Sequence, residues 1–455
     1  MRYLPLTPDE EKKILNVCGE KSFEDLTRDI PDHLRLKKLL NIPAPLHETD
    51  LINHIQKLGE KNTAPQMCSL LGQGAYDHTW PAAVDYLVTR GEFLTAYTPY
   101  QPEVSQGTLQ AIFEYQSMIS ALFGMEVSNA SLYDGSTALV EGVLMAARLQ
   151  SKSKGQVLVS EGVFDHTQKI LKTYLEPLGF ELITWKASHE GVAESSAPSL
   201  NEPVAVILQS PNKWGHIEDW KTLKNTASQL NTKSIAHVTH AHSLSIFEAP
   251  GACGIDIGTG EGQSLGIPVG FGGPYLGLLA CSKKDVRQMP GRLVGKTNDA
   301  NGREAFCVTL STREQHIRRE KATSNICSNQ SLMALRACIY LALNGPQGIK
   351  KIADNSRRAA SAARDILEKQ LKNTQGLKVS SQTFFNEFSL FYSKENERKI
   401  DKLQSHALKH NMILGLKNTA PERSGFKACI SLAFTERFKK ADLEKFEKIF
   451  GELIV

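Results

Sequence analysis

Long uninterrupted apolar runs are missing from this chain of 455 residues. No segment approaches the roughly 20 apolar residues that a membrane-spanning helix needs, so we expect no membrane association. The first eleven residues lack the apolar stretch of a signal peptide, and their acidic residues are atypical of a transit peptide. These absences predict a cytoplasmic protein.

Paired cysteines and an excess of one charge are missing too. The 8 cysteines include no Cys-x-x-Cys pair and no Cys/His cluster at metal-ligand spacing, which predicts reduced, mostly buried thiols and no metal site. The 53 basic residues nearly balance the 49 acidic ones, giving a formal net charge of +4. A dedicated nucleic-acid binder concentrates basic residues on one face, so we expect no nucleic-acid partner.

Short apolar runs alternate with helix-like stretches through the middle of the chain. This alternation predicts an α/β domain with a mainly parallel sheet wrapped by helices. One helix is predicted from about residue 108 to Gly124, and a second follows Asp134 and continues to Leu149. The runs expected to form strands are 157–159, 182–185, 204–208, 234–239 and 275–281.

The two ends of the chain have different patterns. Residues 1–65 are predicted to form a helical arm, whose first helix begins at Thr7 and Pro8. Residues 66–325 form the expected large α/β domain, and residues 326–455 a smaller C-terminal α+β domain. The smaller domain is predicted to contain helices at 332–343, 350–371 and 440–453, and strands at 377–379, 387–391 and 428–432.

The glycine-rich loop from Gly262 to Pro274 lacks a lysine. It resembles the loop of fold-type-I pyridoxal phosphate enzymes, in which a strand ends at the lysine that binds the cofactor as a Schiff base. Gln263, or Ser264 if the register shifts by one residue, stands at the expected lysine position. Neither an amide nor a hydroxyl forms a Schiff base. The alternative is an ordinary glycine-rich turn between two strands.

Two other parts of such a cofactor site can be compared with this sequence. Residues 134–137 precede a helix, as the phosphate loop of these enzymes does, although an ordinary capping turn is the alternative. His240 stands near the position of the aspartate that keeps the pyridine nitrogen protonated, which a neutral histidine would not do. His237, His240 and His242 have no carboxylate or thiolate partner in the motif, so we expect no metal there.

Three further runs, at residues 97–107, 129–137 and 312–326, carry a more specific resemblance. Together they closely resemble glycine decarboxylase, the P-protein of the glycine cleavage system. The similarity is to the N-terminal half of the long single-chain form, and so to the α subunit of the two-subunit form. It extends from about residue 32 to the C-terminus. This resemblance implies a β subunit that carries the cofactor lysine.

The resemblance also implies a reaction. With its β subunit, the chain would decarboxylate glycine by means of pyridoxal phosphate and pass the aminomethyl group to the lipoyl arm of H-protein. The run 97–107 would reach the cofactor site at the subunit interface. Tyr100 and Glu103 are its catalytic candidates, because a tyrosine and a carboxylate can orient an amine and transfer a proton. The other loop candidates are Tyr97, Gln101, Ser105 and Gln106.

Alternatives stay open for these segments and for the whole chain. The run 97–107 can instead be a proline-rich turn that packs aromatic rings. A basic cluster, formed by Arg313, His316, Arg318 and Arg319, can bind the carrier protein, form inter-subunit ion pairs, or be a solvated helix face. The chain as a whole can be a non-catalytic scaffold or regulatory pseudoenzyme that stabilises the β subunit.

Overall fold

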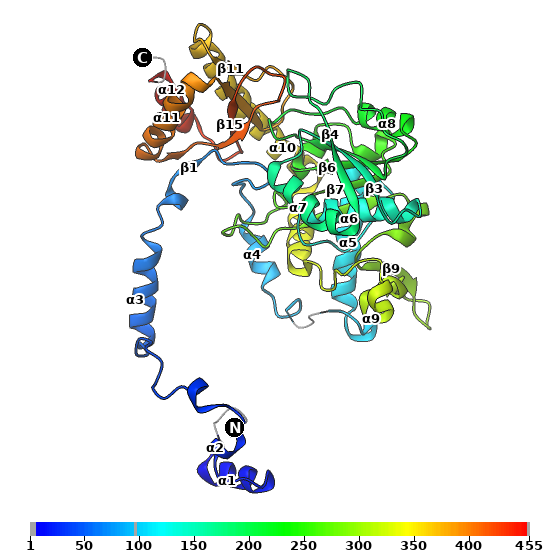
Figure 1. Ribbon diagram of the computed structural model, residues 1–455, viewed down its shortest axis with the longest axis vertical. Helices are drawn as coiled ribbons and strands as arrows, with labels where there is room; N and C mark the ends of the chain where they lie inside the picture. Colours follow the sequence, from blue (N-terminus) through cyan, green and yellow to red (C-terminus); the bar gives the residue numbers. More distant parts are fainter. Residues whose placement is uncertain (1–5, 95–97, 453–455) are drawn as a thin grey trace. The chain divides into compact units, whose positions relative to one another are not determined.

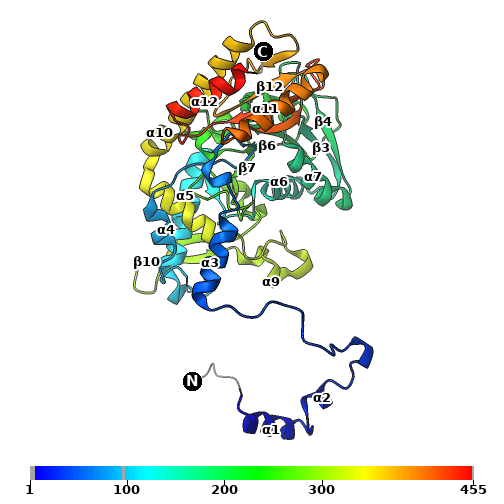
Figure 2. The same ribbon diagram turned by 90° about the vertical axis from the view of Figure 1, so that its left-hand side faces the viewer.

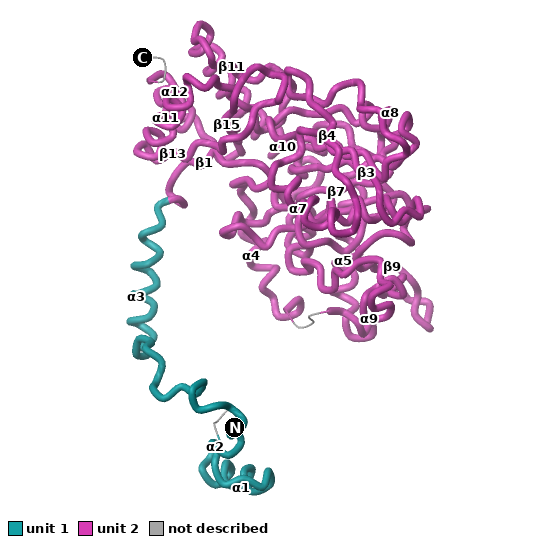
Figure 3. The backbone as a smooth tube through the Cα atoms, in the orientation of Figure 1, with its two compact units in different colours: residues 1–63 teal, residues 64–455 magenta. Residues whose placement is uncertain are grey.

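The computed structural model describes residues 6–94 and 98–452. Two compact units are distinguished, Met1–Thr63 and Ala64–Val455 (Figure 3). The expected end of the arm at residue 65 lies two residues beyond the first unit, and this boundary stays a prediction. The expected boundary between residues 325 and 326 falls inside the second unit and stays a prediction.

The first unit has helices but no core. Thr7 caps α1 (Pro8–Val17) as expected, and its backbone N–H donates a 2.9 Å hydrogen bond to Glu10 Oε2. The other α-helices are α2 (Phe23–Leu26) and α3 (Glu48–Gly59). None of the described residues 6–63 is buried. Because most helical stability in proteins comes from packing, these helices lack the usual tertiary support within the unit.

A seven-stranded sheet forms the centre of the second unit (Figure 1). Its strand order is β2-β8-β7-β6-β5-β3-β4, and the neighbouring pairs from β7 to β4 are parallel, as expected. β8 runs antiparallel to β7, because their connection contains no crossover helix. The strands are β2 (Val127–Ser128), β3 (Gly155–Ser160), β4 (Phe180–Trp185), β5 (Ala205–Ser210), β6 (Lys233–Val238), β7 (Ile257–Glu261) and β8 (Gly277–Cys281).

Helices cover both faces of this sheet. On β5, Val206 and Leu208 belong to one hydrophobic core, whereas Ala205 and Ile207 belong to the core on the opposite face. This alternation buries every residue of the strand, as expected for a parallel sheet between two helical layers. One layer contains α6 (Gly135–Leu149) and α7 (Asp165–Leu175), and the other contains α5 (Gln106–Phe123), α8 (Trp220–Gln229) and the first part of α10 (Ser331–Leu371).

Local signals fix the two helices that border the candidate sites. α5 ends at Gly124, whose φ of 63° is the left-handed conformation that favours glycine at a helix end. α6 begins after Asp134, whose side chain accepts a hydrogen bond from the Thr137 backbone. Both predicted boundaries are confirmed. An antiparallel hairpin of β9 (Leu293–Asn298) and β10 (Glu304–Thr309) contacts α5 and was not expected from the sequence.

The C-terminal part of the second unit contains a four-stranded antiparallel sheet, ordered β11-β12-β15-β14. α10 is kinked at Gly345, whose backbone is non-helical. Gly345 lies in the gap that the sequence predicts between two helices. α10 contacts both α5 and α12, and Figure 2 shows α11 and α12 beside this smaller sheet. Its elements are β11 (Leu377–Val379), β12 (Glu387–Tyr392), β14 (Leu416–Thr419), β15 (Ala428–Ala433), α11 (Glu397–Lys409) and α12 (Lys440–Gly451).

Two short elements complete the part of the second unit that matters for the sites. β1 (Cys68–Ser69) pairs in parallel with β13 (Met412–Ile413), and α4 (Ala82–Val88) follows it. Residues 70–81, which connect β1 to α4, pass close to the glycine-rich loop, since the Tyr76 backbone bonds to Gln263. Across the described residues, no helix is both long enough and apolar enough to span a bilayer.

Candidate functional site

Gln263, at the expected lysine position, is a buried structural residue. It follows β7 and is 1% exposed. Its Oε1 accepts a 2.9 Å hydrogen bond from the Tyr76 N–H, and its Nε2 donates to the carbonyls of Tyr76 at 3.1 Å and Ile267 at 2.8 Å. The side-chain amide therefore fastens residues 70–81 to the glycine-rich loop. Ser264 is also buried, and its hydroxyl has no hydrogen-bond partner among the described residues.

A carboxyl group occupies the start of α6, where a phosphate would be expected. The Gly135 N–H donates a 2.8 Å hydrogen bond to Glu261 Oε2. Glu261 Oε1 accepts from the backbone N–H groups of Gln263 at 2.9 Å and Leu276 at 3.2 Å. Burial raises the pKa of Glu261 to about 8, although these backbone donors act in the opposite direction. One free amide that would suit an anion is thus already satisfied within the chain.

The remaining cavity beside Glu261 is small, about 210 Å³. His237 from β6 lines it, with Nδ1 3.1 Å from the Thr259 hydroxyl. Burial lowers the pKa of His237 to about 3, so the imidazole is neutral. His240 does not line this cavity; β6 ends at Val238, and His240 lies beyond the strand against His78. The end of β6 therefore contributes the His237 imidazole to the cavity wall, and it contributes no acidic side chain.

These residues do not fit pyridoxal phosphate. The connection from β7 to β8 contains no lysine, the α6 N-terminal amide is bound to Glu261, and β6 supplies a neutral His237. Gly135 also approaches Glu261 so closely that a Cβ atom there would lie 2.8 Å from the Glu261 Cβ. The polar groups at this pocket thus bond to one another, and in this sense we call it the closed pocket.

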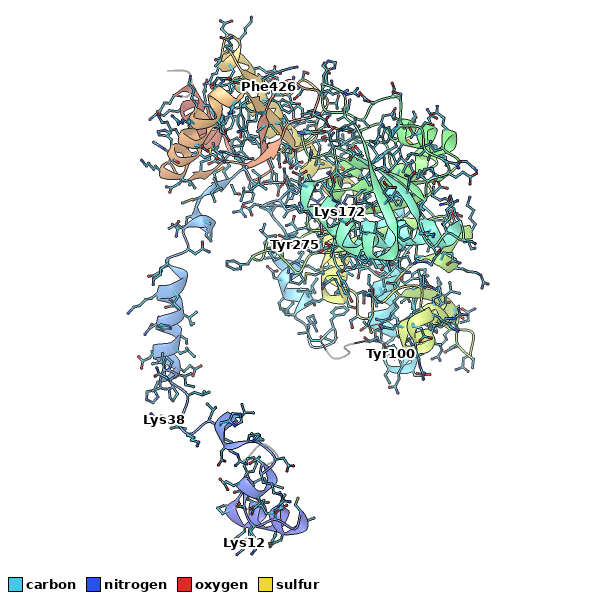
Figure 4. The ribbon with its side chains drawn as sticks, in the orientation of Figure 1. Lys12, Lys38, Tyr100, Lys172, Tyr275 and Phe426 are labelled. Carbon is cyan, nitrogen blue, oxygen red and sulfur yellow. The ribbon has the colours of Figure 1, made fainter. Side chains whose placement is uncertain are left out.

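The loop containing Tyr100 lies elsewhere on the molecule. Figure 4 shows Tyr100 beside α9 (Gln315–Arg318) and well separated from Tyr275, which follows the glycine-rich loop. The Tyr100 ring is 53% exposed, and Glu103, in a short 3-10 turn, is exposed as well. Within the described ranges, neither the Tyr100 hydroxyl nor the Glu103 carboxylate has a hydrogen-bond or ion-pair partner. Tyr97 lies outside the described residues.

Arg292 and His316 surround the Tyr100 ring. The Arg292 guanidinium lies 5.4 Å from the ring centre, and the His316 ring lies 5.7 Å away in an edge-on arrangement. Arg292 is buried, donates to the Cys327 carbonyl at 3.0 Å, and lies 3.8 Å from Glu314 Oε2. The structure thus joins two segments that the sequence analysis treated separately. Nothing in the sequence around Arg292 marked it as a site residue.

Gln106, another loop candidate, holds the loop in place. Gln106 donates to the carbonyls of Pro102 at 2.7 Å and Phe306 at 2.8 Å, and accepts from the Phe306 N–H at 2.9 Å. These bonds attach the start of α5 to β10. Ser105 is buried at the preceding position, whereas Gln101 is exposed. Of the loop candidates in the described part, Tyr100, Gln101 and Glu103 face solvent.

The basic cluster separates into a buried and an exposed part. Arg313 is buried and donates to the backbone carbonyls of Leu310 at 3.1 Å, Gly291 at 3.1 Å, and Met289. Its guanidinium therefore supports the local fold. Arg318 and Arg319 are exposed and form no ion pair within the described ranges. His316 contacts Tyr100 and lies 3.7 Å from Glu314 Oε2.

Replacing Gln263 with leucine should lower the free energy of unfolding. The substitution leaves the buried N–H of Tyr76 and the buried C=O of Ile267 without their partner, which costs about 1–3 kcal/mol for each group. Urea unfolding followed by circular dichroism measures the change. Gln156→Leu is the control, because the Gln156 amide bonds to Glu181 at a solvent-accessible position and its loss should cost about 0.5 kcal/mol or less. Equal stability of the two variants would contradict the role given to Gln263.

His237 should make the protein less stable in acid. Its pKa is lowered to about 3 by burial, against an unfolded value of 6.5. Between these values the unfolded state binds the extra proton, so the free energy of unfolding falls as the pH decreases from 6.5 toward 3. His237→Gln should reduce this slope by up to about 1.4 kcal/mol per pH unit. Urea unfolding from pH 4 to 7 tests this, with exposed His54→Gln as the control; an unchanged slope in His237→Gln would refute it.

Comparison with known proteins gives full-length matches. The family described as glycine cleavage system P-protein matches residues 1–450. A probable glycine dehydrogenase (decarboxylating) subunit 1 of Sphingopyxis alaskensis is 41% identical over 460 residues, covering 100% of both chains. The corresponding Moorella thermoacetica protein is 44% identical over 393 residues, covering 86% of each chain.

Solved structures agree with these matches. The crystal structure of a glycine decarboxylase (P-protein), in inhibitor-bound form, superposes with a TM-score of 0.86 and 39% identity over 100% of both chains. Lactobacillus brevis glutamate decarboxylase matches with a TM-score of 0.65 and 12% identity, covering 93% of this chain and 96% of that one. At that identity the likeness shows the fold alone. The expected fold-type-I class is confirmed.

Proposed function

The chain belongs to the glycine cleavage system P-protein family, and from this membership we propose that it works beside a β subunit that supplies the cofactor lysine. It is a subunit of a heteromeric glycine decarboxylase, since its full-length relatives are named as subunit 1 of that enzyme. One observation supports this proposed division of roles between the two subunits. The chain matches the family over residues 1–450, yet Gln263, whose side chain bonds to the backbone, stands where the lysine is expected.

The proposed substrate is glycine, and the proposed acceptor of the aminomethyl group is the lipoyl arm of H-protein. Pyridoxal phosphate would supply the electron sink for decarboxylation. We assign its binding to the β subunit, because the pocket of this chain is closed by Glu261 and Gln263. The contribution of this chain is then to orient the substrate and to exclude water at the subunit interface.

Tyr100 and Glu103 are the residues through which this chain would act. Both are exposed, and their polar atoms are free of partners within the described ranges. They lie away from the closed pocket of their own chain, so a site they complete would belong to the partner (Figure 4). Arg292 stabilises the position of the Tyr100 ring through a cation–π contact. Tyr97 and Gln101 belong to the same proposed loop.

The arm supports the proposal of an extensive partner contact. Five of its large apolar side chains are between 46% and 98% exposed: Leu39, Leu51, Ile52, Ile55 and Leu58. Exposed apolar surface of this extent is typical of protein interaction sites. We propose that the arm packs on the β subunit. The exposed Arg318 and Arg319 are proposed to contact a partner through ion pairs, a role for which the buried Arg313 is not suited.

The division between subunits can be tested with the isolated chain. Mixed with pyridoxal phosphate and borohydride, it should form no stoichiometric adduct, because no lysine is placed at the closed pocket. The co-purified complex with the β subunit should form one adduct, located by mass spectrometry on the β chain. A stoichiometric adduct at a single lysine of the isolated chain would overturn the proposed division.

Tyr100→Phe and Glu103→Gln should each reduce glycine-dependent carbon dioxide exchange in the reconstituted complex. Groups that transfer or position a proton typically contribute about 100-fold to 10,000-fold. Assembly and the absorbance of the cofactor should not change, because the other chain holds the cofactor. Tyr86→Phe and Glu395→Gln, at exposed positions elsewhere, are the matched controls. Wild-type exchange in both loop variants would favour the alternative, a non-catalytic scaffold.

A further inference from the structure

Three buried histidines meet beside the closed pocket. His78 comes from the segment before α4, and His240 and His242 follow β6. One ring nitrogen of each lies within 4.8 Å of one ring nitrogen of both others, and the three residues are at most 3% exposed. The Nε2 atoms of His78 and His240 are 2.9 Å apart. His237 is not part of this group, because it lies on the strand and faces the cavity beside Glu261.

Part of the cluster has no hydrogen-bond partner. Glu436 Oε2 lies 2.7 Å from His78 Nδ1, so that nitrogen carries the proton, and His78 Nε2 accepts a hydrogen bond from His240 Nε2 in the absence of an ion. The Tyr340 hydroxyl lies 3.2 Å from His242 Nε2. His240 Nδ1 and His242 Nδ1 are buried and have no hydrogen-bond partner among the described residues. Leaving buried polar atoms unpaired costs free energy, so the cluster is not satisfied by its own hydrogen bonds.

We propose that His78, His240 and His242 form a binding site for a divalent transition-metal ion, with Zn²⁺ as the expected ion. Three neutral imidazoles are a common ligand set for zinc, and the fourth position can be taken by water. Zinc–nitrogen bonds of about 2.0–2.1 Å place tetrahedral nitrogens about 3.3 Å apart. The three nitrogens lie within 4.8 Å of one another, so the side chains would move to reach that spacing when an ion binds.

Glu436 has the position of a carboxylate that supports a metal ligand. Histidine ligands usually donate their second ring N–H to a carboxylate or carbonyl, which fixes the tautomer and the ring orientation. Glu436 is itself held by the Thr79 N–H at 2.7 Å and the Thr79 hydroxyl at 2.8 Å. Glu436 also lines a cavity of about 660 Å³, together with Asp77 and Thr79.

A bound ion would join parts of the chain that are distant in sequence. It would link the segment at His78 to the end of β6, beside Tyr340 of α10 and Glu436 after β15. Its role is therefore structural, stabilising residues 70–81 where Gln263 also fastens them. This site is separate from the Tyr100 loop and does not depend on the proposed function.

Metal binding by the purified full-length chain tests the proposal. After treatment with a chelator, the chain should bind one equivalent of Zn²⁺ and show a higher melting temperature with added Zn²⁺, since a ligand that binds only the folded state stabilises it. Co²⁺ should give the visible absorption of a tetrahedral site. His240→Asn and His242→Asn should each lower Zn²⁺ affinity by about 100-fold or more. His237→Asn, a buried histidine outside the cluster, should bind Zn²⁺ as the wild type does.

A milder variant covers the case in which the histidine variants do not fold. Glu436→Gln keeps the three ligands and should weaken Zn²⁺ affinity about 10-fold to 100-fold without changing the stoichiometry. The proposal is overturned if the wild-type chain binds no stoichiometric Zn²⁺. It is also overturned if His237→Asn loses as much affinity as His240→Asn, or if the Co²⁺ spectrum is that of a fully hydrated surface ion.

Discussion

Buried hydrogen bonds at the end of β7 are the constraint on which the sites of this chain depend. Glu261 binds the first amide of α6, and Gln263 binds the backbone of Tyr76. Each of these groups is buried, so separating them would leave polar atoms unpaired. The carboxyl ends of the central strands, where fold-type-I enzymes hold their cofactor, are therefore held closed by the protein itself. Introducing a single lysine by substitution would not reopen this pocket.

Because this pocket is closed, the functional surface is expected on other parts of the molecule. The polar groups of Tyr100 and Glu103 have no partner among the described residues, and the apolar side chains of the arm are not buried within their own unit. Such features make physical sense in a protein that is one part of a larger enzyme, because exposed apolar residues become buried when a partner covers them. The same second unit combines a rigid, internally bonded centre with a loop that presents groups outward.

Much of the fold could be predicted because its signals are local. Gly124 ends α5, Asp134 begins α6, and the apolar runs mark the parallel strands that two helical layers cover. The β9–β10 hairpin was missed, since the outer half of β9 is polar and the hairpin is stabilised by packing on α5. The antiparallel direction of β8 follows from its helix-free connection to β7, which the apolar pattern of the strand does not show.

The sequence by itself determined that the glycine-rich loop contains no lysine, that the chain resembles a known family, and which residues cap its helices. Only the tertiary structure decided which side chains meet. Tyr100 contacts Arg292 and His316, Glu261 bonds to Gly135, and His78 reaches His240 across 162 positions of sequence. Caps and strand patterns depend on neighbours a few residues apart, and so are readable from the sequence. Contacts between distant residues depend on strand order and on how connecting segments pack, which local patterns do not encode.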